Sequence, residues 1–290
     1  MNLPCDTNDL KPQKGKMNLT DTLIKADLED GQGKAIIRED NIFLDDNKIL
    51  SNSVLIEYVN QLIAAIQGYR EKYQNKKPLK GLFVGVQEAN FYESVMCGDE
   101  IYLKGNVIEE IANIKYIKAI IEKNGKMVSE VTTKIFEVED LKEIEQLAKN
   151  NEVEEPQKIN SNISNPPYFL TSYLQRKFYS YINNLTIEKE IISFDFMCPK
   201  EFDPFDGHFE NNPILPGIML IEIANVALSL LLEKQITINS IKKMKIGGVI
   251  TPYRKILCNV KLNSTNNNSF SVEFSYENKK EISRFNGSFI

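Results

Sequence analysis

Three side chains of this sequence have the types and settings that suit proton transfer. His208 is the one histidine of the chain, and an imidazole gains and loses its proton near neutral pH. Glu57 and Glu222 stand within apolar stretches, over residues 54–66 and 218–232. Because burial favours the protonated form of a carboxyl group, such a glutamate can act as a general acid. The alternative is structural, with both glutamates facing solvent or a satisfied internal network.

Both apolar stretches are predicted to be helices with their polar side chains gathered on one face. Spacings of three and four residues bring side chains to the same side of an α-helix. The polar residues of the first stretch are Glu57, Asn60 and Gln61, and those of the second are Glu222, Asn225 and Ser229. A buried carboxylate without a partner is costly, so these faces favour a functional role.

Residues 205–222 read FDGHFENNPILPGIMLIE, and this segment resembles the signature of the 3-hydroxyacyl-acyl-carrier-protein dehydratases of the hot-dog fold. That signature is commonly G-H-F-P-x-x-P-x-x-P-G-V-x-x-x-E. The matching positions are Gly207, His208, Phe209, Pro213, Pro216, Gly217 and Glu222. Glu210 replaces a proline of the signature, and Val226 stands where the family commonly has a glutamine. The resemblance covers residues 190–290 and, more weakly, 8–138.

The resemblance implies a division of roles between the two halves. In this family two hot-dog units pair, and each active site takes its histidine from one unit and its acid from the other. Alignment of the two glutamates places Phe43 where a histidine would stand and Gln61 on the family's glutamine. One composite site is therefore expected to contain His208, Glu57 and Gln61. The opposite site, with Phe43 and Glu222, is expected to be inactive.

The resemblance also implies a reaction and a partner. Water is expected to leave a 3-hydroxyacyl thioester, carried on acyl carrier protein, to give a trans-2-enoyl thioester in fatty-acid or polyene- and polyketide-type synthesis. Neither a cofactor nor a metal is expected. A hot-dog acyl thioesterase and a non-catalytic partner of acyl carrier protein are the alternatives. The acidic carrier needs a basic landing site, for which the candidates are Lys242, Lys243, Lys245, Arg254 and Lys255.

A second group of candidates concerns the negative charge that develops on the thioester oxygen. Pro216-Gly217 is predicted to open the second helix, where backbone N–H groups lack helical partners. Gly217 and Ile218 are therefore candidate donors to that oxygen. Asn52 and Ser53, one turn before Glu57, are the competing pair, and a third possibility is that Pro-Gly only starts the helix.

Two similar series of elements are predicted around these residues. The predicted helices cover 53–69 and 217–234, and the strands that follow them cover 81–86, 100–110, 114–123 and 128–138, then 242–250, 255–263, 270–277 and 283–290. Asn124-Gly125 is typical of a two-residue hairpin. Because both helices are apolar nearly all round, each sheet is expected to wrap its helix. The predicted fold is an α+β double hot-dog, each half an antiparallel sheet wrapped around a long central helix.

The best domain boundary is an acidic stretch that becomes rich in Asn and Ser, over residues 137–165. The expected organisation is an N-terminal hot-dog domain without the catalytic histidine over 1–138, a linker over 139–165, and a C-terminal hot-dog domain with the histidine motif over 166–290. A short exposed helix is expected from Asp140 to Lys149.

Composition excludes several other classes of protein. A formal net charge of −5 argues against a general nucleic-acid-binding surface. The four cysteines are scattered, which argues against a zinc site or a disulfide framework and fits a reducing cytoplasm. Residues 1–16 contain no apolar core of signal-peptide length. The apolar run 214–232 includes Glu222 and Asn225, so a buried helix is preferred to a membrane span. Homo-oligomers of such chains are a further expectation.

Overall fold

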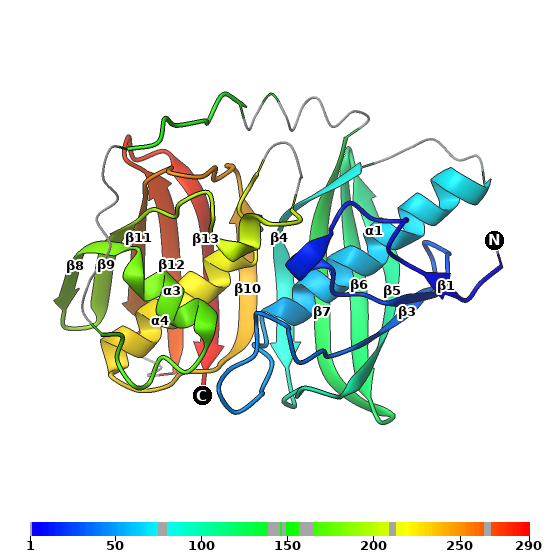
Figure 1. Ribbon diagram of the computed structural model, residues 1–290, viewed down its shortest axis with the longest axis horizontal. Coiled ribbons are helices and arrows are strands. Elements are labelled where there is room, and N and C mark those ends of the chain that lie inside the picture. Colours follow the sequence, from blue (N-terminus) through cyan, green and yellow to red (C-terminus); the bar gives the residue numbers. More distant parts are fainter. Residues whose placement is uncertain are drawn as a thin grey trace.

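The computed structural model describes residues 2–74, 80–138, 146, 149–156, 165–208, 213–263 and 268–290. Within these ranges the chain forms two halves that lie side by side, each with a row of strands and one long helix (Figure 1). Most of the expected linker and of the helix from Asp140 to Lys149 lies outside the described residues. So do Phe209 and Glu210 of the histidine motif.

The first half contains the long helix α1 (Val54–Gln74) and a 3₁₀ turn, η1 (Gly15–Met17). Its strands are β1 (Cys5–Asp6), β2 (Thr22–Lys25), β3 (Gly31–Ile36), β4 (Lys80–Phe91), β5 (Glu100–Ile111), β6 (Ile114–Lys123) and β7 (Lys126–Val138). The hairpin expected between β6 and β7 is confirmed, since Asn124 and Gly125 have φ angles of 51° and 75°. Positive φ at both central residues is what a type I′ turn requires.

The second half repeats this plan around helix α4 (Met219–Leu232). A short helix, α3 (Tyr173–Ser180), and a 3₁₀ turn, η2 (Asp203–Phe205), precede it. The strands are β8 (Ile182–Glu188), β9 (Ile191–Phe196), β10 (Ile238–Ile246), β11 (Ile256–Leu262), β12 (Ser269–Tyr276) and β13 (Glu281–Phe289). The strand expected over 242–250 is wrong at both ends. The observed strand, β10, starts earlier, at Ile238, and ends before Gly247-Gly248. Beyond these glycines the chain leaves the sheet, and Ile250 O accepts a hydrogen bond from Leu215 N–H at 2.8 Å.

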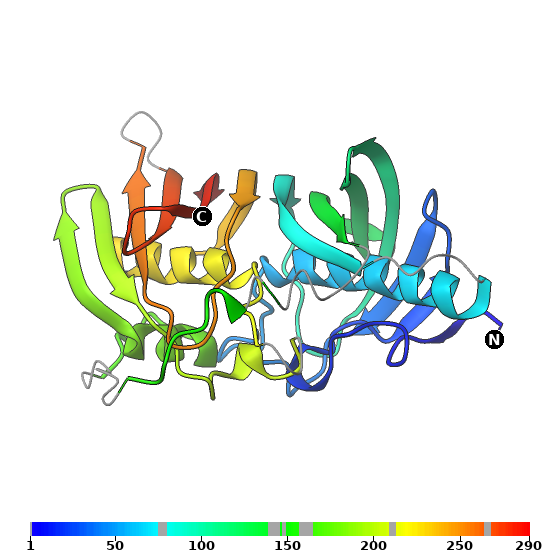
Figure 2. The same cartoon turned by 90° about the horizontal axis from the view of Figure 1, so that it is seen from above.

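The thirteen strands of the described residues form one antiparallel sheet in the order β1-β2-β3-β5-β6-β7-β4-β10-β13-β12-β11-β9-β8. The halves join edge to edge where β4 pairs with β10, in the register Asn90 to Ser240, Ala89 to Ile241 and Glu88 to Lys242. Seen from above, the sheet curves behind the two long helices (Figure 2). The connecting segments lie on the opposite side of these helices.

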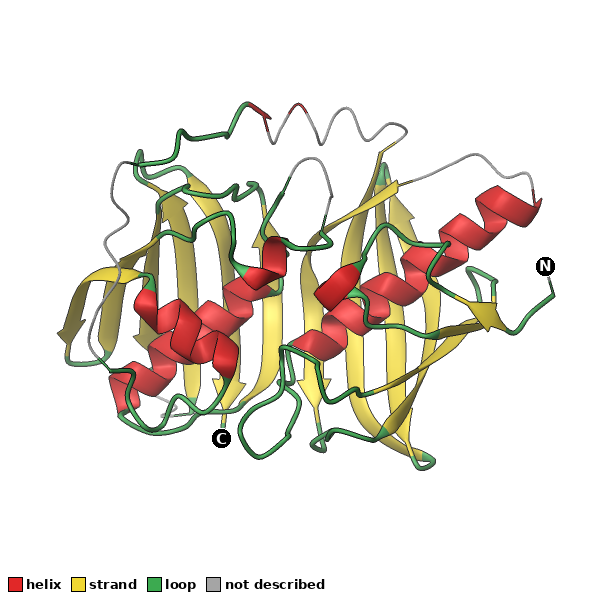
Figure 3. Cartoon of the chain, in the orientation of Figure 1, coloured by secondary structure: helices red, strands yellow, loops and turns green. Residues whose placement is uncertain are grey.

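Both central helices are buried along most of their length, which explains why their sequences are apolar on nearly every face. The strands form the layer behind them, and α3 crosses in front of α4 (Figure 3). The expected α+β architecture, with a sheet wrapped around a helix in each half, is confirmed. Within the described ranges, no helix has the length and hydropathy needed to cross a bilayer.

Helix α3 was absent from the predicted elements, although a local signal for it exists. Ser172 caps its first turn, accepting from Gln175 N–H at 3.1 Å, while the Gln175 side chain accepts from Ser172 N–H at 3.2 Å. This reciprocal capping box is a recognisable start of a helix. The helix is short, so its apolar periodicity is weak evidence by itself.

Candidate active site

A cavity of about 620 Å³ has both Glu57 and His208 in its wall. Its first-half wall follows α1 from Glu57 to Lys72, a rise of roughly 22 Å at 1.5 Å per residue. Its apolar lining includes Ile63, Leu82, Phe83, Val107, Ile117, Ile135, Ile214, Leu215, Ile246 and Val249. Charged side chains such as Lys115 and Glu137 also line the cavity, which is therefore largely but not wholly apolar, with a histidine from one half and a glutamate from the other.

The loop that carries His208 is held by the first half of the chain. Lys14 N–H donates to Gly207 O at 3.0 Å, and Lys16 Nζ lies 2.7 Å from Asp203 Oδ1. Gly207 has a φ of 79°, and a Cβ atom there would lie 2.0 Å from Lys14 O. Only glycine accepts both constraints. The glycine before His208 thus lets the histidine loop lie directly against the other half.

His208 is held in one tautomer by a backbone carbonyl. Its Nδ1 lies 2.8 Å from Ile214 O, and because a carbonyl oxygen only accepts, Nδ1 carries the hydrogen. Nε2 then bears the lone pair. Burial lowers the pKa of His208 to about 4, with the Ile214 bond opposing this shift. The imidazole is therefore neutral at pH 7 and in the form that a general base requires.

Glu57 is a buried acid in the first turn of α1. Its side chain is 4% exposed, and burial raises the pKa of its carboxyl group to about 7, against the opposing effects of Gln61, Asn60 and Lys11. Gln61 Nε2 donates to Glu57 Oε1 at 3.0 Å. Because Oε1 accepts this bond, the carboxyl proton belongs on Oε2. Near pH 7 a large share of the molecules carry that proton.

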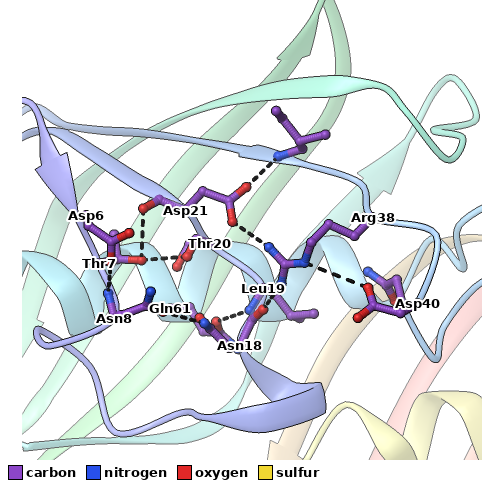
Figure 4. A network of polar contacts seen from close by, with 12 residues as sticks. Asp6, Thr7, Asn8, Asn18, Leu19, Thr20, Asp21, Arg38, Asp40 and Gln61 are labelled. Carbon is purple, nitrogen blue, oxygen red and sulfur yellow. Dashed lines mark hydrogen bonds and ion pairs between the residues drawn. The ribbon is translucent and has the colours of Figure 1, made fainter.

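Gln61 is itself fixed on both sides of its amide. Its Nε2 donates to Met17 O at 2.7 Å, and its Oε1 accepts from Leu19 N–H at 3.0 Å. Figure 4 shows the bond to Leu19 within a larger polar network, in which Arg38 joins Asp21. This network secures the segment that holds Gln61 and, through it, the orientation of Glu57.

Lys11 is a buried cation in the same wall that sequence reasoning missed. It is 4% exposed, and its Nζ donates to Gln61 Oε1 at 3.1 Å and to Asn18 Oδ1. Burial lowers the pKa of Lys11 to about 7, although Glu57 and Asp21 act in the opposite direction. No spacing rule singles out this lysine, because it comes from an irregular segment that folds back over α1.

The start of α4 places Gly217 in the wall of this cavity, and Ile218 is the next residue along the chain. The first paired N–H groups are those of Met219 and Leu220, which bond Pro216 O at 2.9 Å and Gly217 O at 3.2 Å. Within the described ranges, the N–H groups of Gly217 and Ile218 bond no backbone carbonyl. Gly217 lines the cavity, and a Cβ there would lie 2.7 Å from the Phe83 ring.

The competing donors Asn52 and Ser53 lie elsewhere, in a second cavity of about 110 Å³. Phe43 and Glu222 line this smaller space. Glu222 is 3% exposed, and its Oε1 accepts hydrogen bonds from the hydroxyls of Ser51 and Ser53. Burial raises the pKa of Glu222, and the two serines oppose that shift. Val226 is fully buried in α4 and is not in this wall.

The structure therefore groups the predicted site residues into two sets. His208, Glu57 and Gly217 line the larger cavity, with Gln61 directly behind Glu57, whereas Glu222 lines the smaller one. A neutral imidazole, a carboxyl group that is partly protonated near pH 7 and a helix N-terminus around a largely apolar cavity suit proton transfer on a substrate with an apolar part. No cluster of metal-ligating side chains occurs among the described residues.

Several of the basic residues expected to receive an acidic partner are already engaged. Lys242 lies 3.1 Å from Glu88, and Lys255 lies 2.9 Å from Asp195. The Arg254 guanidinium stands over the ring of Tyr276, 5.0 Å from its centroid. The landing site for a carrier protein stays a prediction, now centred on Lys243 and Lys245.

Sequence profiles of two dehydratase families match the two halves. The ApeP-like family, described as ApeP dehydratase, matches residues 5–146, and the ApeI-like family, described as ApeI dehydratase, matches residues 184–287. The chain is a tandem of these two dehydratase families. In this tandem dehydratase, Glu57 belongs to the ApeP-like half and His208 to the ApeI-like half. No curated protein matches its sequence.

Solved structures share the fold of the tandem dehydratase at low identity. An acyl-ACP thioesterase from Bacteroides thetaiotaomicron is 12% identical, with a TM-score of 0.56 over 92% of this chain and 100% of its own. The 12:0-ACP thioesterase from Umbellularia californica is 10% identical, with a TM-score of 0.56 over 92% and 95%. The CurJ dehydratase is 11% identical, with a TM-score of 0.54 over 98% of both chains. The shared fold is the double hot-dog.

Proposed function

We propose that the tandem dehydratase removes water from a 3-hydroxyacyl thioester carried on acyl carrier protein, giving the trans-2-enoyl thioester. The observation that carries this proposal is the placement of His208 and Glu57 in the wall of one cavity, from opposite halves of the chain. The apolar lining of that cavity suits an acyl chain. The part of α1 that lines the cavity rises by roughly 22 Å, which is longer than a short acyl group.

The proposed reaction uses each group for one proton. His208 Nε2 takes a proton from C2, and the electrons of that C–H bond form the C2–C3 double bond. The C3–O bond breaks as Glu57 Oε2 gives its proton to the leaving oxygen, so that the hydroxyl departs as water. The N–H groups of Gly217 and Ile218 stabilise charge on the thioester oxygen. Proton transfer from His208 back to Glu57, through that water, restores the starting state.

The test is the formation of conjugated product by the purified full-length chain. The substrates are 3-hydroxyacyl groups of several lengths, attached to acyl carrier protein or to pantetheine as a simpler thioester. Ultraviolet absorbance and mass spectrometry would measure the enoyl thioester and the loss of one water. We expect enoyl product and no free thiol.

A parallel measurement of free thiol distinguishes dehydration from hydrolysis. Release of thiol without enoyl product would replace the proposal with a thioesterase activity. Binding of every thioester without turnover would instead support a non-catalytic partner of acyl carrier protein. Comparison of carrier-bound with pantetheine-bound substrate tests the partner separately, because a carrier-dependent enzyme should show a much lower KM for the carrier-bound form.

A further inference from the structure

Asn60 has a buried side-chain amide whose nitrogen, Nδ2, has no acceptor among the described residues. It lies on α1, one turn beyond Glu57, and is 8% exposed. Thr133 Oγ1 lies 3.1 Å from Asn60 Oδ1, to which it donates, and 3.3 Å from the backbone oxygen of Gly85. Within the described part of the chain, Asn60 Nδ2 has no hydrogen-bond partner. A buried N–H donor without an acceptor destabilises the folded protein, so a specific explanation for Asn60 Nδ2 is needed.

The unpaired amide and the acid lie beside the same part of the cavity. Asn60 and Glu57 both line it, and a side-chain interaction with Asn60 lowers the pKa of the Glu57 carboxyl group. Among the described residues, Nδ2 nevertheless has no acceptor in hydrogen-bonding geometry. An oxygen atom bound near both groups would find one proton donor on each side.

We propose that Asn60 Nδ2 binds the C3 hydroxyl oxygen of the substrate. This inference rests on the proposed dehydration and adds a substrate-binding residue to it. The hydroxyl oxygen has two lone pairs, one for the amide N–H and one for the proton that Glu57 Oε2 delivers. When the C3–O bond breaks, the oxygen keeps both contacts and leaves as water. Asn60 thereby selects thioesters with an oxygen at C3 and aligns that oxygen with the acid.

The second half provides a matched position for comparison. Asn225 follows Glu222 at the same spacing as Asn60 follows Glu57, and it is also 8% exposed. It lines the smaller cavity with Phe43, and the atom it leaves unsatisfied is Oδ1, an acceptor. A change at Asn225 therefore alters a similar helix without altering the cavity that holds His208.

The test compares binding of paired ligands that differ only in the C3 hydroxyl. The probes are a 3-hydroxyacyl pantetheine thioester and the saturated acyl pantetheine thioester of equal length, with His208→Ala as the background so that neither ligand reacts. We expect Asn60→Leu to weaken binding of the hydroxylated probe about tenfold and to leave the saturated probe within about twofold. In the otherwise unchanged enzyme, Asn60→Leu should lower kcat/KM by at least the same factor.

Controls separate this role from a structural one. Asn225→Leu should leave both affinities and kcat/KM unchanged, and Asn60→Ala is the second variant if Asn60→Leu fails to fold. Equal weakening of both probes, or no preference for the hydroxyl before substitution, would overturn the inference. Absence of enoyl product from the unmodified enzyme would overturn the proposed function instead. The binding comparison is separate from that result, because it measures affinity in the His208→Ala background, where neither probe reacts.

Discussion

The two cavities that are lined by residues of both halves have a similar arrangement but differ in volume and in the side chain that accompanies the glutamate. Each has a buried glutamate from the first turn of a central helix. Glu57 shares a cavity of about 620 Å³ with His208. Glu222 shares a space of about 110 Å³ with Phe43.

The comparison separates what the fold supplies from what chemistry requires. The fold supplies a buried carboxyl group in both places, and burial raises both pKa values. Only one carboxyl group has a neutral imidazole in the same cavity and room for a substrate. The other accepts bonds from Ser51 and Ser53, so Glu222 connects α4 to the segment that leads into α1. On the proposed function, Glu57 therefore takes part in the reaction, whereas its counterpart Glu222 joins the halves.

The largest effect is expected from His208→Ala, which removes the proposed base. We expect kcat/KM for enoyl formation to fall by about 10³-fold or more, measured by absorbance. Addition of Phe43→His to this variant should restore nothing, because the smaller cavity has no room for the acyl chain. Recovered activity in the double variant would show that the two cavities differ only in the histidine.

The next effect concerns the two glutamates, through Glu57→Gln and its counterpart Glu222→Gln. Loss of the acid should lower kcat/KM by about 10²- to 10³-fold, whereas the change at Glu222 should lower thermal stability and leave kcat/KM near its original value. Equal losses of activity in both variants would contradict the division of roles.

The stability of Glu57→Gln provides an independent check on burial of the acid. The folded-state pKa of Glu57, about 7, lies above its ordinary value, so its contribution to stability is greatest at low pH and is lost as pH rises through 7. At pH 8 the folded protein must bury a carboxylate or bind a proton. Glutamine avoids both, so the variant should unfold at a higher temperature than the original protein at pH 8, measured by calorimetry.

A smaller effect is expected from Gly207→Ala, which disturbs only the support of His208. A Cβ at this position meets Lys14 O at 2.0 Å, so the histidine loop must move away from the first half. We expect about a tenfold fall in kcat. Gly247→Ala is the control, because a Cβ there meets nothing within 4 Å. Similar losses in both variants would indicate a general effect on folding.

The smallest effect is a shift in pH dependence. With His208 as the base and Glu57 as the acid, kcat/KM should fall below about pH 4 and above about pH 7. Lys11 lowers the pKa of Glu57, so Lys11→Met should move the alkaline limb to higher pH. Lys72→Met changes a lysine at the far end of the same cavity and should leave that limb in place.

Sequence patterns predicted the repeated architecture because helix periodicity, strand alternation and the Asn124-Gly125 turn are local properties. An acid on an apolar helix made both Glu57 and Glu222 conspicuous, whereas His208 and its pairing with Glu57 followed from the resemblance of residues 205–222 to the dehydratase signature. Lys11 could not be predicted in the same way. Its burial depends on how an irregular segment crosses α1, and its partner Gln61 is fifty residues away. The predicted bounds of strand β10 were wrong because Gly247 and Gly248 interrupt the alternating pattern without showing where hydrogen bonding to the neighbouring strand ends.

The pairing of β4 with β10 has a consequence for how such a protein can change over time. When two identical chains pair, every substitution appears in both copies. Each copy must then provide both the acid of one site and the base of the other. Here both partners are parts of one polypeptide, joined in register through Ala89 and Ile241. Each half can therefore vary independently. On the proposed function, this loss of symmetry permits one half to supply the acid and the other the base, and it leaves a single working site.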